Sequence, residues 1–299
     1  MTIRRAAEGP AIIYSPKAQL LGGLSIFGSA FFLYLSTLVI RWAQGRVLVD
    51  PAYFVFARFI LGFAVVSAAM SVRGHKIKVH RWHLLIGRTV GNTLSVFCFY
   101  KAVSLTTVAE ANILNMTYPL FVTVFSWMFL SKQRDLPATL ILMVAVVGVW
   151  LVLSPGKIGL NIGNLWGLAS GMLGAAAIIY LNLSRQEHDT HTILFFMFGF
   201  GSLGIFLLFH EHIFVPDLRE FLFLISCAAC GVIGQYLLTI GFRYVTAMEG
   251  SIVSSSRILL AAVLGPYLAA DPPLSLAGWV GALMIFGADV LLAYRKVSA

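Results

Sequence analysis

The chain has 299 residues, of which 11% are charged and 59% are hydrophobic, and its mean hydropathy is +0.89. A soluble protein carries about a quarter charged residues, so this chain has too few charges to cover a water-facing surface and is predicted to lie in lipid. The formal net charge of +9 does not indicate nucleic-acid binding, because the basic residues lie in short segments between apolar runs.

Apolar runs of about 20 residues, the length that crosses a bilayer, predict ten transmembrane helices and an all-α integral membrane protein. The first run follows Arg4 and Arg5 and has no small-x-small cleavage site at its end, so we interpret it as a retained helix. Turn-forming pairs such as Asp50-Pro51 separate the runs. In chain order the predicted spans are 18–42, 51–72, 82–103, 107–130, 137–154, 161–183, 191–212, 219–244, 247–270 and 274–294.

The distribution of Lys and Arg predicts the orientation of these spans. If the N-terminus is cytoplasmic, 13 of the 21 basic residues lie on that side, five lie on the opposite side, and Arg58, Arg88 and Arg257 lie inside spans. Cytoplasmic loops carry an excess of Lys and Arg, so both termini are predicted to be cytoplasmic.

The most specific signal is a self-match at an offset of 139 residues, between residues 102–113 and 241–252. Each copy contains Thr-x-x-Glu directly before an apolar run, which is typical of a helix capping box; the caps are Thr107 with Glu110, and Thr246 with Glu249. The match predicts two homologous five-helix repeats, residues 1–155 and 156–299. Because each repeat has an odd number of spans, the second is inverted, an arrangement that favours a transporter with its site near the midplane between the halves.

At this point the sequence resembles a known family. The passage Ala-x-x-x-Thr/Val-Thr/Ala-x-x-Glu-Ala/Gly-x-Ile/Leu, present twice with five spans per copy, is similar to the drug/metabolite transporter superfamily and specifically to its bacterial EamA-type members. Arg58 and Pro119 match residues that this family often carries, whereas Arg257-Ile258 departs from its usual Pro-containing pair. The resemblance covers essentially the whole chain and implies export of a small organic solute. The amino-acid exporter branch is one candidate within the family.

Polar side chains inside the spans form two stripes. Asn112, Asn115 and Tyr118 repeat every three residues in the fourth span, and the residues 139 positions later, ending at Arg257, are polar as well. Buried polar groups in a bilayer usually face the bundle interior, so the stripes predict one central cavity, with helix–helix hydrogen bonding as the alternative. The predicted substrate-binding residues are Arg257, Asn112, Asn115, Tyr118, Ser254, Gln235, Asn92, Ser95 and Trp166.

Arg257 lies ten residues into its predicted span, about 15 Å along the helix, near the bilayer centre. A buried guanidinium needs an acceptor, and we expect a substrate carboxylate, with a structural pair to Asp289 as the alternative. An arginine beside neutral polar and aromatic groups suits an amino acid, which is the preferred substrate class. Arg58 and Arg88 lie less than halfway into their spans, so their side chains can extend to the membrane interface, and we expect structural roles for both.

The remaining motifs predict structural roles or alternative functions. Helix capping is favoured over proton coupling for Glu110, and Pro119 is predicted to kink the fourth helix as a hinge. An acidic cavity group would instead indicate an exporter of cationic drugs, and the clusters His188/His191 and His210/His212 keep an integral-membrane enzyme as a remote alternative. No metal site, cofactor or phosphate loop is predicted, so energy must come from a gradient, with a proton gradient as one candidate.

Overall fold

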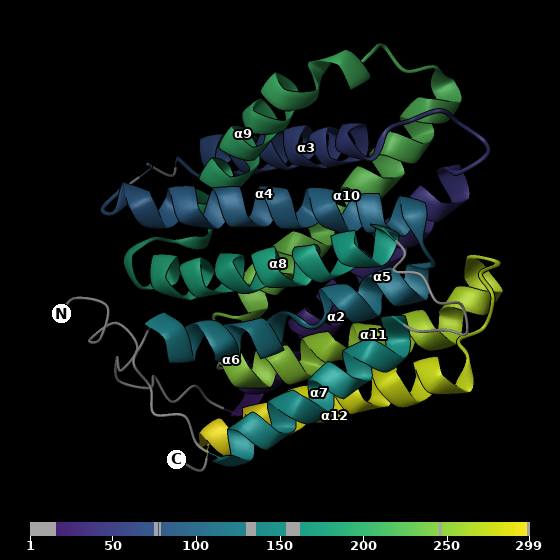
Figure 1. Cartoon of the computed structure of the whole chain (residues 1–299). Helices are drawn as coiled ribbons and strands as arrows, with labels where there is room; N and C mark the ends of the chain where they lie inside the picture. Colours follow the sequence, from purple (N-terminus) through teal and green to yellow (C-terminus); the bar gives the residue numbers. More distant parts are fainter. Residues whose placement is uncertain are drawn as a thin grey trace.

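The structure, a computed structural model, describes residues 16–74, 77, 79–129, 136–153, 162–244 and 247–297. Within these ranges the secondary structure is entirely helical, which confirms the predicted all-α class (Figure 1). The first half contains α2 (Pro16–Ala43), α3 (Pro51–Val72), α4 (Trp82–Leu105), α5 (Val108–Asn115), α6 (Tyr118–Phe129) and α7 (Leu136–Leu153). The second contains α8 (Ile162–Glu187), α9 (Thr190–Phe209), the short η1 (His210–His212), α10 (Leu218–Gly241), α11 (Ala247–Leu268) and α12 (Leu276–Val297).

Length and hydropathy identify membrane-crossing helices directly. Within the described residues, α2, α3, α8, α9 and α10 each contain a segment that is long and apolar enough to cross a bilayer. Large apolar side chains such as Leu207 and Leu208 on α9 and Trp150 on α7 point away from the bundle and are exposed. Apolar surface of this kind is stable in lipid, where the helices satisfy their own backbone hydrogen bonds.

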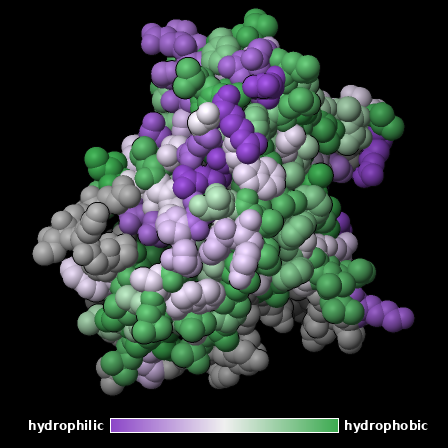
Figure 2. All heavy atoms as spheres, turned by 90° about the vertical axis from the view of Figure 1, so that its right-hand side faces the viewer, coloured by the Kyte–Doolittle hydropathy of each residue, from purple (hydrophilic) through white to green (hydrophobic). Residues whose placement is uncertain are grey.

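Successive helices run back and forth, so the bundle has two ends (Figure 1). We call them the Arg73 end, where α3 ends beside the start of α9, and the Asp271 end, where α11 ends beside the end of α2. Figure 2 views the molecule from the Asp271 end, where hydrophilic residues gather toward the middle and hydrophobic residues flank them. This pattern fits a polar, water-facing end surrounded by lipid-facing helices.

Local chemistry sets where the helices begin. The side chain of Asp50 accepts a hydrogen bond from the backbone N–H of Ala52 and caps α3, while Pro51 occupies its first turn. Asp217 and Glu220 form a capping box at the start of α10. These Asp and Pro residues are the ones that separate the apolar runs in the sequence, so the predicted boundaries agree with the helices to within a few residues.

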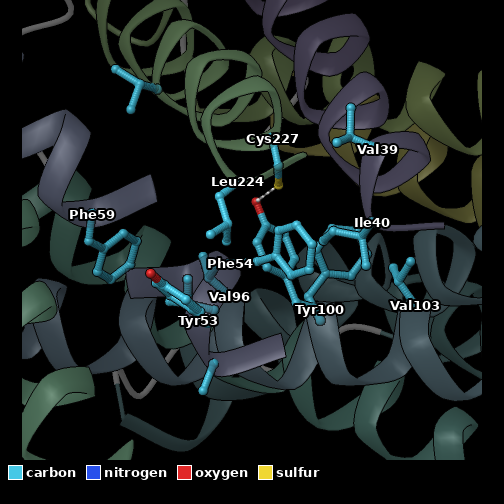
Figure 3. Packing of buried hydrophobic residues seen from close by; sticks show 14 of the residues in the cluster. Val39, Ile40, Tyr53, Phe54, Phe59, Val96, Tyr100, Val103, Leu224 and Cys227 are labelled. Atoms are coloured by element: carbon cyan, nitrogen blue, oxygen red, sulfur yellow. Dashed lines mark hydrogen bonds between the residues drawn. The ribbon is translucent and has the colours of Figure 1, made fainter. Parts of the chain in front are cut away.

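The most extensive helix contacts join the two halves: α4 packs on α8, α2 on α10, α7 on α12 and α3 on α9. Glycines allow the closest of them. A Cβ added at Gly281 on α12 would lie 2.5 Å from the carbonyl oxygen of Gly148 on α7, so the two backbones touch there. Apolar side chains from α2, α3, α4 and α10 fill the space between these pairs, with Tyr100 near their centre and the Sγ of Cys227 3.7 Å from its hydroxyl oxygen (Figure 3).

The predicted fourth span, 107–130, is two helices rather than one. The chain leaves helical geometry at Met116 and Thr117, directly before Pro119 in the first turn of α6. The interruption predicted from Pro119 is therefore present, as a full break between two helices, while its role as a hinge stays a prediction. Pro119 has no N–H to donate to the carbonyl of Asn115, and proline is tolerated in a first turn, so the break precedes it. Ile258, at the matching position of the second copy, carries an N–H, and α11 is continuous there.

Candidate substrate-binding cavity

A cavity of about 90 Å³ lies in the middle of the bundle, beside the break between α5 and α6. Helices from both halves contribute to it, and none of the described residues that line it is acidic. Its apolar lining includes Leu33, Val96 and Phe99. Its polar lining consists of Arg58, Arg88, Asn92, Ser95, Asn115, Tyr118, Gln235, Ser254 and Arg257.

Arg257 enters this cavity from α11 and is only 4% exposed. One of its terminal nitrogens donates to the Oδ1 of Asn115, and its guanidinium lies 5.1 Å from the centre of the Phe99 ring. The alternative pairing with Asp289 is absent from this structure, in which the carboxylate of Asp289 accepts a hydrogen bond of 2.8 Å from Ser255. The guanidinium is therefore buried against an amide and an aromatic face, without a carboxylate partner among the described residues.

The orientation of the Asn115 amide follows from its other contact. Its Nδ2 donates to the Oγ of Ser170 on α8 at 2.9 Å, which leaves Oδ1 to face Arg257. The Oγ of Ser95 on α4 donates to the backbone carbonyl of Ser170 at 2.8 Å. These bonds join α4, α5 and α8 around the cavity, and a Cβ added at Gly171 would lie 2.5 Å from the Oγ1 of Thr117, so α8 packs directly against the helix break.

The expectation that Arg58 and Arg88 can extend to the membrane interface is wrong. Both are buried, at 3% and 2% exposure, and both line the cavity. Arg58 donates to the hydroxyl of Tyr100 at 3.1 Å and to the Oε1 of Gln235 at 3.3 Å. Gly231 on α10 makes room for it, because a Cβ there would lie 2.7 Å from the arginine Cδ. The position of these arginines along their helices therefore does not determine where their side chains go, because both lie on helix faces that point to the bundle interior.

The sequence contained a signal that would have placed Arg88 correctly. Arg88, Asn92, Ser95 and Phe99 are spaced by four, three and four residues, so they share one face of a helix. All four line the cavity from α4. The stripe that predicts Asn92 and Ser95 therefore begins one turn earlier, at an arginine.

Two of the predicted substrate-binding residues are not brought to the cavity. Asn112 is fully buried and donates through Nδ2 to the backbone carbonyl of Val108 at 2.8 Å and to the Oγ1 of Thr37 at 3.3 Å. Trp166 packs edge-on against Phe97, with ring centres 5.9 Å apart. Asn112 points toward α2, and the break after Asn115 interrupts the face that a continuous helix would have shared with Tyr118.

The carboxylate of Glu110 takes part in the predicted helix cap. Glu110 donates its backbone N–H to the Oγ1 of Thr107 at 3.1 Å, while its Oε2 accepts from the N–H of Thr107 at 3.4 Å and contacts the hydroxyl of Thr106. It does not line the cavity. The corresponding second cap cannot be compared, because Thr246 and the side chain of Glu249 lie outside the described residues.

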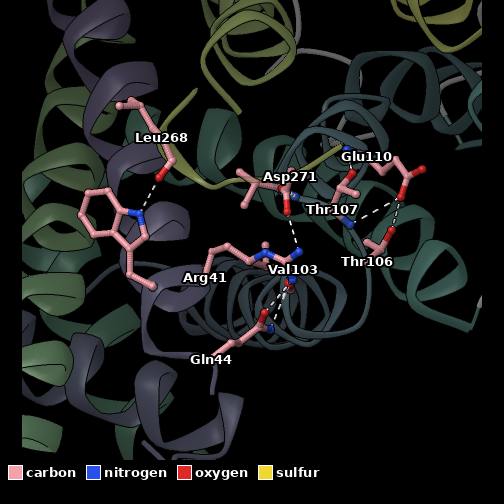
Figure 4. Close-up of polar contacts among 10 residues, drawn as sticks. Arg41, Gln44, Val103, Thr106, Thr107, Glu110, Leu268 and Asp271 are labelled. Atoms are coloured by element: carbon pink, nitrogen blue, oxygen red, sulfur yellow. Dashed lines mark hydrogen bonds and ion pairs between the residues drawn. The ribbon is translucent and has the colours of Figure 1, made fainter. Parts of the chain in front are cut away.

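A polar network closes the Asp271 end (Figure 4). The Nη2 of Arg41 lies 2.5 Å from the Oδ1 of Asp271, and its Nη1 donates to the Oε1 of Gln44 at 2.7 Å. The other carboxylate oxygen of Asp271 accepts from the backbone N–H of Val108, the first residue of α5, at 2.7 Å. One buried carboxylate thus joins α2, α5 and the α11–α12 loop. In the sequence, Asp271 stands out only as the residue before Pro272 and Pro273, in a break between apolar runs.

The Arg73 end carries a larger recess of about 880 Å³ between α3, α9 and α10. Its lining combines apolar side chains with Arg73, His191, Tyr236, Arg243 and Tyr244. Arg73 and His191 approach each other across it, with 3.5 Å between Nη1 and Nε2.

The histidines of the two clusters contact the backbone or lie at an exposed turn. The Nε2 of His188 lies 3.1 Å from the backbone N–H of His80, which donates to it, and its Nδ1 lies 3.1 Å from the carbonyl of Ser184. His210 and His212 are at the exposed η1 turn. Within the described part of the chain, no group of three or more His, Cys, Asp or Glu side chains could hold a metal ion.

Comparison with known proteins decides the family. The EamA-like transporter family matches residues 20–154 and, a second time, residues 161–294. This chain belongs to the EamA-like transporter family. The resemblance drawn from the repeated Thr-x-x-Glu passage is thereby confirmed, and the two matches cover nearly the whole chain.

Relatives of this EamA-like transporter extend the same conclusion. The pseudopaline exporter CntI of Pseudomonas aeruginosa is 24% identical over 277 residues, which cover 91% of this chain and 96% of the relative. An uncharacterized transporter of Archaeoglobus fulgidus is 27% identical over 216 residues, covering 71% and 76% of the two chains. A protein of known crystal structure shares the fold, with a TM-score of 0.61 and 23% identity over 93% of this chain and 99% of its own. The protein is a multi-pass membrane transporter of small molecules.

Proposed function

We propose that this EamA-like transporter is a secondary transporter that exports small amphipathic metabolites, with amino acids as the preferred class. One observation carries the proposal: Arg257 lies in a buried cavity beside neutral amides and an aromatic ring, and none of the described lining residues is acidic. A guanidinium in such surroundings binds a carboxylate through two parallel hydrogen bonds. Leu33, Val96 and Phe99 supply apolar surface for the rest of the solute.

The size of the cavity supports transport by alternating access. Small-molecule sites usually have volumes of about 300 Å³ or more, whereas this cavity has about 90 Å³. Helices must therefore move apart before a solute can enter or leave. The network of Arg41 and Asp271 closes one end, while the recess lies at the other, which supports an arrangement that accepts solute from the Arg73 end.

The helix contacts support two inverted five-helix repeats, residues 1–155 and 156–299. The third helix of the first half, α4, packs on the first helix of the second half, α8; in the reciprocal pair α10 packs on α2. The contacts of α3 with α9 and of α7 with α12 join equivalent helices. A two-fold relation between the halves accounts for all four pairs, and the cavity lies between the halves.

Charge at the two ends supports cytoplasmic termini in a bacterial inner membrane. Lys17, Arg73, Arg81, Arg185 and Arg243 lie toward the Arg73 end, and Arg41, Arg46, Lys101 and Arg219 lie toward the other. The acidic residues Glu187 and Asp189 lie toward the Arg73 end, whereas Asp50, Glu211, Asp217, Glu220 and Asp271 lie toward the other. The positive-inside bias then places the Arg73 end in the cytoplasm. Export would run from there to the Asp271 end, in keeping with the name of the Pseudomonas relative.

Uptake into proteoliposomes tests the proposal, with a panel of amino acids and of organic cations, with and without a pH gradient. We expect amino-acid transport that Arg257→Ala abolishes and that the matched control Arg46→Ala, at an exposed site outside the cavity, retains. Stimulation by the pH gradient would identify protons as the coupling ion. Transport of cations alone, surviving Arg257→Ala, would instead establish a cationic-drug exporter and overturn the proposal.

A further inference from the structure

The cavity contains unused hydrogen-bond donors. Among the residues that line it, five buried side-chain nitrogens have no partner: the Nε of Arg58, the Nε and Nη2 of Arg88, the Nδ2 of Asn92 and the Nε of Arg257. Every unpartnered buried side-chain polar atom found on the lining residues is a donor, and none is an acceptor. Leaving such groups unpaired is costly, so the cavity is built for a solute rich in acceptors.

Arg88 presents the clearest binding group. Its Nε and Nη2 atoms form one edge of the planar guanidinium, which is the pair that binds both oxygens of a carboxylate side-on. The residue is 2% exposed, and Asn92, one turn further along α4, adds its free Nδ2 on the same face. Arg58 differs, because Tyr100 and Gln235 already hold its two terminal nitrogens.

The charges of the cavity are not balanced by the described residues. Three guanidinium groups line it, and Arg58 is close enough to Arg88 and to Arg257 for their charges to repel. The buried carboxylates of Asp271 and Asp289 bind Arg41 and Ser255 instead. A zwitterion with one carboxylate adds no net negative charge, so it would leave all of this positive charge buried in the membrane.

The arginines are staggered along the bundle. At a helix rise of about 1.5 Å per residue, Arg88 lies about 9 Å and Arg257 about 15 Å from the helix ends at the Arg73 side, and Arg58 about 21 Å. The free edge of Arg88 enters the cavity from α4 and Arg257 enters it from α11. Two oxyanion groups on one extended molecule can each pair with one of them.

The geometry points to a substrate with at least two carboxylates, one bound by Arg257 and the other by the free edge of Arg88 together with Asn92. This inference rests on the proposed function and narrows its substrate class from amino acids in general to extended dicarboxylic amino acids. Arg58 is held in place by Tyr100 and Gln235. It supplies a fixed positive charge between the carboxylate bound by Arg257 and the Asp271 end.

Matched pairs of probes test the second carboxylate. Glutamate and glutamine, or aminoadipate and its side-chain amide, differ only by one carboxylate. Binding is measured by thermal stabilisation of the purified full-length protein and by competition in proteoliposomes. We expect each dicarboxylate to bind about tenfold more tightly than its amide, the contribution of a charge-assisted bond. Arg88→Gln should reduce dicarboxylate affinity about tenfold more than amide affinity, whereas Arg257→Gln should weaken both alike.

A second variant and two further comparisons also test the second carboxylate. Arg88→Lys keeps the charge and tests a protein that folds even if Arg88→Gln does not; its loss of the side-on edge should still shrink the preference for the dicarboxylate. Equal affinity for acid and amide in the wild-type protein would overturn the inference while leaving Arg257-dependent amino-acid transport standing. Tighter binding of phosphoserine than of any dicarboxylate would also overturn it. Transport of cations alone would remove both the inference and the proposed function.

Discussion

The Nη2 of Arg41 lies 2.5 Å from the Oδ1 of Asp271, and this ion pair joins the end of α2 to the loop that precedes α12. The same carboxylate accepts a hydrogen bond from the first backbone N–H of α5. The N-terminus of a helix attracts negative charge, so Asp271 is stabilised by both an arginine and a helix end. In an alternating-access cycle this contact must open before a solute can leave through the Asp271 end.

Replacement of Asp271 by alanine should therefore loosen this end. Asp271 is buried but Arg41 is 28% exposed, so we expect the free energy of unfolding to fall by about 2 kcal/mol, below the usual cost of breaking a fully buried pair. Hydrogen exchange at the Val108 amide should become faster, whereas exchange in α9 should stay the same. Arg46→Ala is the control, because Arg46 lies close to Arg41 in the sequence but is exposed. Unchanged exchange at Val108 would show that the pair does not hold this end closed.

Gly231 should control the position of Arg58. A Cβ there would lie 2.7 Å from both Cδ and Nε of Arg58, so Gly231→Ala must displace the arginine from Tyr100 and Gln235. The arginine side chain is flexible, so the protein should still fold, while transport should fall about tenfold, as expected for a lost charge-assisted contact. Gly204→Ala is the matched control, because nothing lies within 4 Å of its added Cβ. Equal transport by both variants would remove Arg58 from the binding site.

The contact of Gly148 and Gly281 should be essential for packing of α7 on α12. Gly281→Ala places a methyl group 2.5 Å from a backbone oxygen that cannot rotate away, so the helices must separate. Overpacking of this kind costs about 1–3 kcal/mol, measured by chemical unfolding in detergent micelles. Gly287→Ala, on the same helix with open space around its Cβ, should be neutral or slightly stabilising. If both variants lost the same free energy of unfolding, the contact between Gly148 and Gly281 would not be the cause of the loss.

Much of the fold could be predicted because its determinants are local. Apolar runs of bilayer length predict each helix, and capping residues such as Asp50 mark where helices begin. Pro119 predicts an interruption on its N-terminal side, because it cannot donate to the carbonyl of Asn115. The extent of that interruption was not predictable from the same rules, because the break at Met116 and Thr117 packs against Gly171 of α8, which is distant in the sequence.

The site was predictable where polar residues recur along one helix face. Asn92 and Ser95 on α4 and Ser254 and Arg257 on α11 were chosen in this way, and all line the cavity. Arg88 was predicted to reach the membrane interface because it lies less than halfway into its span, although it shares a helix face with Asn92 and Ser95. Contacts between distant segments, such as Arg41 with Asp271, leave no periodic signal in a single sequence, so only the folded structure reveals them.

The Asn115–Arg257 bond offers the sharpest test of why the cavity is cationic. Asn115→Asp preserves the shape of the side chain but gives Arg257 a carboxylate partner inside the protein. Since Arg257 would then be neutralised before any solute arrives, carboxylate transport should fall by at least about tenfold, the usual scale for a charge-assisted bond. The hydroxyl of Ser170, which accepts from Asn115 and donates to the carbonyl of Gly167, can turn its hydrogen to the new carboxylate. The lost bond to Gly167 costs about 1 kcal/mol, so the fold should persist. Asn182→Asp makes the same chemical change on α8 outside the cavity lining and should leave transport intact. If Asn115→Asp transports carboxylates as well as the wild-type protein does, Arg257 does not bind them.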